Sequence, residues 1–445
     1  MDADVRIHAV LWLYRFLSST IGPAVARLAI SRDSKLDAAT FPERMAKRGL
    51  PESLPPGRRI WLNAASVGET VALSTFVKEW RKLNPDDVLF VTNTTATGHE
   101  RALKLLSREA YWIGYLPLDI PAVVSRAVAA LKPAAFITVE AEAWPNLLDE
   151  LGKSGAKRVL INGRMTLANK QGLKRYITAR IWRKFDFVVA RSETDRSSFE
   201  QLGVAAEKLA VCGEIKLDVE MPRLLESQLS VLRSDFGLAE RHCWIAASTH
   251  PREEELALRA LMSAREVEPQ TRLVLVPRHP ERFGEVAELV KSNGLECWKY
   301  SNGPGGYGAP VLLLDAMGKL TDFYQACGLA VVFGSFYGPG VHSVIEPASY
   351  SRPIVVGPRT FNTDLPERMA REAALIRLEK AEFLQEAVRS WATGNRSKYS
   401  PVDFVQLGGN AGAFVETNKG AAQRTAHKVH EFLTSAAIQT QISPR

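Results

Sequence analysis

Short apolar runs alternate with amphipathic stretches along most of this chain, and this alternation constrains the fold more than any other feature. The amphipathic stretches predict helices, among them Ile120–Leu131, Lys170–Phe185 and Ser192–Leu202. The apolar runs are typical of buried strands, and repetition of the two predicts a mostly parallel sheet with helices on both faces. The first series of predicted strands is Ile60–Asn63, Val88–Asn93, Tyr111–Tyr115, Ala134–Val139, Arg158–Asn162, Phe187–Arg191 and Leu209–Cys212.

A second series of the same kind begins near residue 243. The segment Glu214–Leu238 between the two series contains no predicted strand, and we interpret it as a hinge. A chain of 445 residues is long enough for two full cores. We therefore predict an α/β fold with two doubly wound, Rossmann-like domains that face each other across a cleft. The second series of predicted strands is Cys243–Ser248, Arg272–Pro277, Val311–Leu314, Leu329–Phe333 and Pro353–Val356.

The ends of the chain add two helical segments to this plan. We expect residues 1–35 to form a separate helical segment, residues 36–217 the first domain and residues 218–420 the second. A last helical pattern runs from Ala411 to Ala436, and we expect the helix and tail of residues 421–445 to pack back on the first domain.

The segment His8–Ile30 is the one candidate for contact with a membrane. Arg15 in its middle and the Gly22-Pro23 pair argue against a helix that spans the bilayer. Trp12, Tyr14 and Phe16, with arginines that can snorkel, favour a helix that lies in the interface; a buried N-terminal helix is the alternative. The net charge of +8 suits an anionic membrane surface, and the chain carries no nucleic-acid-binding motif.

Cysteine and aspartate spacing gives no sign of a metal site. The four cysteines are widely separated and form no C-x-x-C pair, which indicates a reducing compartment and no metal cluster. The only D-x-D triplet is Asp2-Ala3-Asp4, at the start of the chain. We therefore expect no metal ion and no cofactor.

Glu69 stands where the first predicted strand turns into a helix, after the small residues that include Ser66 and Gly68. Ligands of an open parallel sheet gather at the carboxyl ends of its strands. A carboxylate in the first turn of a helix at that edge can accept a proton from a substrate hydroxyl. The alternative is that Glu69 only caps its helix.

Other strand ends in the first half also carry polar side chains. Arg164 follows a strand directly, and an arginine at that place suits a carboxylate or phosphate that it can bind bidentately. Glu140 and Glu142 lie after another strand, and for this pair we favour a structural role, orienting basic neighbours, over acid–base chemistry.

The strand ends of the second half favour a nucleotide-sugar site. Glycines allow backbone to approach a ligand closely, a helix start offers amides to a phosphate, and Glu346 one turn later can accept hydrogen bonds from a ribose diol. Arg278 adds a fixed positive charge. The candidate nucleotide-binding residues are Ser248, His250, Arg278, His279, Met317, Gly318, Gly340, His342, Ser343 and Glu346.

Taken in order, these motifs resemble those of the 3-deoxy-D-manno-octulosonic acid (Kdo) transferases of lipid A assembly, over nearly the whole chain. Single motifs arise by chance, but the ordered set is specific. The matching motifs are Ser66–Glu69 (SVGE), the E-x-E-x-W-P-N run that ends at Asn146, N-x-R at Asn162 and Arg164, Gly213–Asp218, STH followed by Glu253-Glu254, Pro277–Phe283, Glu346–Ala348, Gly357–Asn362 and N-x-GA at Asn418.

The resemblance implies a GT-B glycosyltransferase that moves Kdo from CMP-Kdo to a tetraacylated lipid A precursor at the cytoplasmic face of the bacterial inner membrane. It implies inversion, no metal, and Glu69 as general base. Ser66, Gly68, Asn162 and Arg164 would then contact acceptor or Kdo, and Asn362 would join the nucleotide-binding residues. Asp119 would assist Glu69, although an N-cap of its own helix is the simpler role. The first domain would bind the acceptor and the second the donor.

Two alternatives follow from departures on the donor side. The G-G-H-N of the family reads Gly340-Val341-His342-Ser343 here, and its M-G-E-L reads Met317-Gly318-Lys319-Leu320. A GT-B transferase or epimerase that uses another nucleotide sugar is one alternative. A non-catalytic membrane-bound scaffold is the other, and the presence of Glu69 and its neighbours argues against it.

Overall fold

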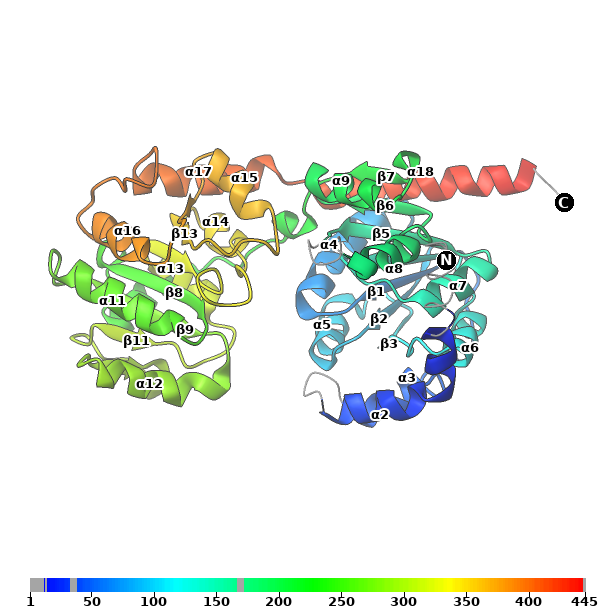
Figure 1. Cartoon of the computed structure of the whole chain (residues 1–445), viewed down its shortest axis with the longest axis horizontal. Helices are drawn as coiled ribbons and strands as arrows, with labels where there is room; N and C mark the ends of the chain where they lie inside the picture. The colour runs from blue at the N-terminus through cyan, green and yellow to red at the C-terminus, as the bar shows by residue number, and fades with distance from the viewer. Residues whose placement is uncertain (1–11, 13, 33–37, 166–171, 443–445) are drawn as a thin grey trace. The chain divides into compact units, whose positions relative to one another are not determined.

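The chain folds into two compact α/β units in this computed structural model, which describes residues 12, 14–32, 38–165 and 172–442 (Figure 1). Unit 1 comprises the described residues of Met1–Val219 and Lys419–Arg445, and unit 2 comprises Glu220–Asn418. The chain thus crosses between the units at residue 219, within the predicted hinge, and returns at residue 419.

Unit 1 is built on a seven-stranded sheet in which every paired strand is parallel and the order is β3-β2-β1-β4-β5-β6-β7. All seven predicted strands are present, and each end lies within one residue of the prediction. The strands are β1 (Arg59–Ala64), β2 (Val88–Asn93), β3 (Trp112–Tyr115), β4 (Ala135–Val139), β5 (Lys157–Gly163), β6 (Phe187–Ala190) and β7 (Leu209–Val211).

Helices cover both faces of this sheet because alternate residues of each strand face opposite ways. In β1, Ile60 and Leu62 pack with α4, α5 and α18, whereas Trp61 packs with α6 and α7. The helices of unit 1 are α2 (Gly22–Arg32), α3 (Phe41–Arg44), α4 (Val67–Leu83), α5 (Ala96–Leu106), α6 (Pro121–Leu131), α7 (Pro145–Lys153), α8 (Gly172–Trp182), α9 (Glu193–Gln201) and α18 (Ala421–Ile442).

Unit 2 contains a second parallel sheet with the order β10-β11-β9-β8-β12-β13-β14. The strands β10 and β14 were not predicted, because β14 has only two residues and β10 ends in a lysine and is only partly buried. The strands are β8 (Cys243–Thr249), β9 (Arg272–Pro277), β10 (Cys297–Lys299), β11 (Val311–Leu313), β12 (Leu329–Val332), β13 (Ile354–Val356) and β14 (Ile376–Arg377).

The second sheet is also covered on both faces. In β8, Trp244 and Ala246 pack with α11, α16 and α17, whereas Ile245 packs with α10 and α13. The remaining helices are α10 (Glu226–Phe236), α11 (Glu253–Arg265), α12 (Phe283–Ser292), α13 (Leu320–Ala326), α14 (Ile345–Ser349), α15 (Leu365–Arg371), α16 (Phe383–Ala392) and α17 (Phe404–Thr417).

The C-terminal helical pattern belongs to two helices, so the prediction of one helix over Ala411–Ala436 is wrong. α17 ends at Thr417 and α18 begins at Ala421, and Gly420 between them has a positive φ of 86°. The backbone amides of Gly420 and Ala422 donate to the carboxylate of Asp218, which holds the start of α18 on unit 1. α17 packs in unit 2 and α18 packs in unit 1 against α4.

The N-terminal segment is helical at residues 14–20 and in α2. Within the described part of the chain, no helix has the length and apolar character needed to cross a membrane. One side of the segment docks on unit 1, where Tyr14 donates to Asp119 at 2.9 Å. Trp12, Phe16 and Val25 are half exposed or more.

Candidate functional site

The strand-to-helix turn after β1 places Glu69 in the first turn of α4, at the carboxyl edge of the sheet. Ser66 is the N-cap and accepts from the amide of Glu69. The carboxylate of Glu69 accepts from the amide of Ala65 at 2.8 Å and from the hydroxyl of Ser66 at 3.1 Å. The capping contacts expected under the simpler interpretation are therefore present, and they fix the carboxylate while leaving it partly exposed.

The surroundings of Glu69 raise its pKa to about 7. Burial is the largest cause, and the like charges of Glu140 and Glu142 add to it. The Ala65 amide and the Ser66 hydroxyl act in the opposite direction. A carboxylate with a pKa near neutrality is suited to accept a proton from a hydroxyl group.

Glu140 lies beside Glu69 and organises two cations, in keeping with the structural role we favoured. Its buried carboxylate pairs with Arg164 at 2.9 Å and with the ammonium of Lys216. Burial opposes ionisation, but Lys216 and Arg164 outweigh it and lower the pKa of Glu140. The side chains of Arg164 and Lys216 remain about one-third exposed, so both can meet an anionic ligand.

Lys216 was not among the predicted site residues, although it lies in the Gly213–Asp218 motif. Its ammonium is 3.9 Å from the position that a Cβ on Gly68 would occupy, so it lies next to the start of α4. A lone lysine in a short 3-10 helix, Ile215–Asp218, carries no periodic signal. The position of Lys216 near Glu69 therefore becomes apparent only in the tertiary structure.

Asn162 is buried and hydrogen-bonded inside unit 1, and its contact with acceptor or Kdo stays a prediction. Its side chain is 1% exposed, donates to Glu214 at 2.8 Å and accepts from the amide of Ile215 at 2.9 Å. Both ends of the amide are therefore used inside the protein. Asn162 thereby positions the segment that carries Lys216.

The prediction that Asp119 caps its own helix is wrong, whereas its assistance to Glu69 stays a prediction. The N-cap of α6 is Ile120, which makes no side-chain capping bond. Asp119 accepts from the amides of Asn146 and Leu147 at 3.1 and 2.8 Å and from the hydroxyl of Tyr14. It therefore caps α7 and ties it to the N-terminal segment.

Unit 2 contains a pocket of about 290 Å³ at the carboxyl ends of β8, β9 and β11. Glu346 at its wall is partly buried, and desolvation raises its pKa. Large side chains that were not among the predicted site residues complete the wall, among them Phe283, Leu314 and Tyr324. The predicted nucleotide-binding residues that line this pocket are Ser248, Arg278, Met317, Gly318, His342, Ser343 and Glu346.

The other predicted nucleotide-binding residues, His250, His279, Gly340 and Asn362, do not line this pocket. His250 Nε2 is 2.8 Å from His342 Nε2, and the ring of His279 meets that of His250 edge-on at 5.5 Å. Burial, with His250 and Arg278 as further causes, lowers the pKa of His342 to about 4, so its ring is neutral near pH 7.

Asn362 and Gly340 hold the loop that carries His342. Asn362 donates to the carbonyl of Val341 at 2.9 Å. Gly340 has a φ of 135°, and a Cβ there would lie 2.7 Å from the Asn362 side chain. The two residues therefore fix the loop from behind, and Gly340 permits their close approach.

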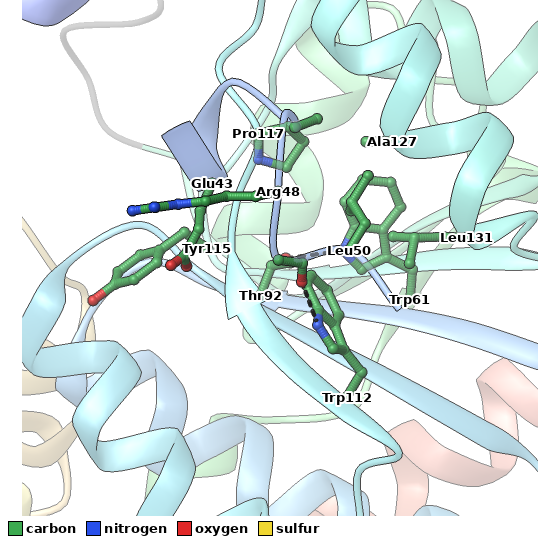
Figure 2. Close-up of a pocket in the computed structure, with 12 residues that line it drawn as sticks. Glu43, Arg48, Leu50, Trp61, Thr92, Trp112, Tyr115, Pro117, Ala127 and Leu131 are labelled. Atoms are coloured by element: carbon green, nitrogen blue, oxygen red, sulfur yellow. Dashed lines mark hydrogen bonds between the residues drawn. The ribbon is translucent and has the colours of Figure 1, made fainter. Parts of the chain in front are cut away.

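A smaller cavity in unit 1, of about 10 Å³, lies between the sheet and α6 (Figure 2). Trp61, Leu50 and Leu131 form its apolar wall, and Glu43, Arg48 and Tyr115 lie at its other side. No predicted site residue lines it, and its volume suits about one water molecule. We assign it to the core.

A metal site was not expected from the sequence. Across residues 12, 14–32, 38–165 and 172–442, no three side chains of His, Cys, Asp or Glu come together as metal ligands. Asp2 and Asp4 lie outside the described residues.

Comparisons with known proteins identify the family of this chain. Residues 39–219 match the family model described as 3-Deoxy-D-manno-octulosonic-acid transferase (kdotransferase). The chain is 32% identical to a 3-deoxy-D-manno-octulosonic acid transferase of Haemophilus influenzae over 86% of this chain and 88% of that protein. It is 30% identical to the Bordetella pertussis transferase of the same name, over 88% of this chain and 91% of that protein.

The fold is shared with a solved glycosyltransferase of Rickettsia africae, at a TM-score of 0.59 and 11% identity, over 85% of this chain and 99% of that one. The two parallel-sheet units resemble those of GT-B glycosyltransferases. The sequence identity over nearly nine-tenths of the chain decides the family. This chain belongs to the 3-deoxy-D-manno-octulosonic acid transferases, and it is a glycosyltransferase.

Proposed function

We propose that this protein transfers Kdo from CMP-Kdo to a tetraacylated lipid A precursor, with inversion and with Glu69 as the general base. The observation that carries the proposal is the carboxylate of Glu69 at the carboxyl edge of the unit 1 sheet, with its pKa raised to about 7. Membership of the family supports Kdo as the sugar.

In this mechanism Glu69 removes the proton from an acceptor hydroxyl as that oxygen attacks the anomeric carbon of Kdo. The bond from this carbon to the phosphate oxygen breaks, and CMP leaves with the electron pair. Attack opposite to the leaving group inverts the anomeric centre. Arg164 and Lys216, both partly exposed, are the cations of unit 1 that suit the Kdo carboxylate or an acceptor phosphate.

The unit 2 pocket is the proposed site of the nucleotide. Arg278 at its wall suits the charge that develops on the departing phosphate. The carboxyl of Glu346 suits the ribose hydroxyls. These side chains provide charge and hydrogen bonds for the whole leaving group, so the proposed reaction uses no metal ion or cofactor.

A lipid acceptor requires contact with a membrane, and the N-terminal segment supplies a suitable surface. The exposed side chains of Trp12, Phe16 and Val25 are apolar, and Arg15 and Arg27 accompany them. Such a surface suits the anionic cytoplasmic face of the bacterial inner membrane. The proposed attachment is monotopic, through residues 1–35.

The test is Kdo transfer from CMP-Kdo, generated in the assay, to a detergent-dispersed lipid A precursor. Glu69→Gln keeps the shape of the side chain but cannot accept the proton, and we expect kcat to fall by about 10²–10⁴. Asp403→Ala, which removes the N-cap of α17 in unit 2, is the control for a lost helix cap.

Equal rates for the Glu69→Gln variant and the parent would eliminate Glu69 as the base. If the parent protein transferred no Kdo in this assay, the proposed donor sugar or acceptor would be wrong. The nucleotide is tested separately: CMP should raise the Tm and UDP should not, because only a ligand that binds the native state stabilises it.

A further inference from the structure

Glu253, in the first turn of α11, is a fully buried carboxylate that binds a loop of unit 2 through backbone amides. Its side chain is 0% exposed. Oε1 accepts from the amides of Phe336, Tyr337 and Gly338 at 3.0, 3.0 and 3.2 Å. Oε2 accepts from the amides of Gly334 and His250 at 2.8 and 3.0 Å.

The loop bound in this way follows β12 and leads to the nucleotide pocket. Its first part, residues 334–338, is held by Glu253. Its last part carries His342 and Ser343, which line the pocket. His342 is held by the ring of His250, whose own backbone amide donates to Glu253. Glu253 thus binds the first part of the loop directly. It also binds the backbone of His250, whose ring contacts His342 in the last part of the loop.

Amides that converge on one point form a concave site for an anion, and glycine-rich loops often use such a site for phosphate. Here the carboxylate of Glu253 fills that site from inside the protein. Among the described residues no lysine, arginine or histidine side chain forms an ion pair with Glu253. The loop amides therefore supply the partial positive charges that stabilise this buried carboxylate.

The neighbouring Glu254 shows that burial alone does not create this arrangement. Its side chain is also 0% exposed. It accepts from the hydroxyl of Thr249 at 2.9 Å and pairs with Arg282 at 2.6 Å. No hydrogen bond of its carboxylate among the described residues reaches the loop 334–343.

We propose that Glu253 is the positioning residue of the donor site: its carboxylate occupies the amide cradle of residues 334–338 and so sets His342 and Ser343 at the pocket wall. The proposal rests on the proposed function for the identity of the nucleotide. It also implies that a donor phosphate binds at the pocket wall and not at the amides of residues 334–338, because these are already satisfied.

The test compares Glu253→Gln with Glu254→Gln. Glutamine at 253 turns an NH₂ group toward amides that need an acceptor, so the cradle is broken without a change in side-chain size. We expect hydrogen exchange of residues 334–338 to accelerate at least about tenfold in the ligand-free variant. The Kd for CMP and the KM for CMP-Kdo should rise at least about tenfold, with kcat within about threefold of the parent.

Glu254→Gln is expected to lower Tm by a similar amount, because it also disturbs a buried carboxylate, and to leave loop exchange and CMP affinity within about twofold of the parent. Equal effects of both variants on CMP affinity would overturn the proposal, as would unchanged loop exchange in Glu253→Gln. If Glu253→Gln does not fold, Glu253→Asp, with the charge kept but the reach shortened, must show the same loop and KM effects. A parent that fails to bind CMP would contradict the proposed nucleotide, while the exchange comparison would still decide the role of Glu253.

Discussion

The carboxylate of Glu69 caps the start of α4 and is also the proposed general base. Its carboxylate closes the first turn of α4 through Ala65 and Ser66, which holds the side chain in one orientation. Burial and two neighbouring glutamates keep its pKa near 7, so the carboxylate binds a proton more strongly than an exposed glutamate does. A capping contact therefore positions the base and does not compete with its chemistry.

The pKa of Glu69 predicts the pH dependence of the reaction. A base must be ionised, so kcat/KM should increase as pH rises through about 7. Glu142→Gln removes one of the like charges that raise this pKa, and the acid limb of the profile should move to lower pH. Glu100→Gln, on the exposed surface of α5, is the control. An acid limb that stays in place in Glu142→Gln would show that another group sets it.

His342 predicts a pH dependence of stability in unit 2. Its pKa is about 4 in the folded protein and near 6.5 when unfolded, because burial, His250, Arg278 and His279 disfavour the charged ring. The unfolded state binds more protons between these values, so stability is present above about pH 6.5 and is lost as pH falls toward 4.

The loss due to His342 amounts to at most about 3 kcal/mol. Urea unfolding at about pH 5 and about pH 7.5 measures it, and His342→Gln should flatten the difference between the two values. An unchanged pH difference in the variant would assign the effect to other groups.

At the scale of elements, the break between α17 and α18 decides which unit each helix stabilises. Gly420 permits the turn, and the carboxylate of Asp218 accepts from the amides of Gly420 and Ala422. Leu407 of α17 is buried in unit 2, and Leu433 of α18 is buried in unit 1. The last helix of the chain therefore completes the core of the first unit.

This arrangement predicts that matched truncations act on different units. Leu433→Ala should destabilise unit 1 by roughly 2–4 kcal/mol, because it leaves a cavity against the sheet. Leu407→Ala should destabilise unit 2 by a similar amount and spare unit 1. Hydrogen exchange resolved by peptide reports each unit separately. If Leu433→Ala accelerated exchange in unit 2 and not in unit 1, the assignment of α18 would be wrong.

At the scale of the whole molecule, an apolar N-terminal surface accompanies a net charge of +8. Trp12, Phe16, Ile21 and Val25 expose 66%, 50%, 53% and 55% of their surface, which is unusual for side chains of one short segment. Tyr14 on the docked side binds Asp119. The segment is thus held on unit 1 by polar contacts while its apolar side chains remain outside.

We expect the protein to sediment with vesicles that contain anionic phospholipid, and to do so less at high salt, because charge and apolar burial both contribute. Phe16→Glu combined with Val25→Glu should abolish binding. Val405→Glu changes a side chain of unit 2 that is 87% exposed, and it should have no effect. Binding that survives the double substitution would contradict the membrane assignment of this segment.

The sequence by itself determined all the described strands except β10 and β14, the two parallel sheets, and seven of the residues that line the pocket of unit 2. Buried parallel strands are nearly all apolar, so their pattern is strong, and ligands gather where such strands end. The strand β14 has only two residues, and β10 ends in a lysine and is only partly buried, so neither shows this apolar pattern.

Only the tertiary structure decided what each polar side chain does at those strand ends. The side chains of Asn162 and Asp119 accept hydrogen bonds from backbone amides inside the protein. Lys216, from a segment distant in sequence, lies next to the start of α4 near Glu69. The carboxylate of Glu253 accepts hydrogen bonds from backbone amides of the loop 334–338, more than 80 residues away in sequence. A polar side chain gains most where it meets otherwise unsatisfied groups, and those groups come together only when the chain has folded.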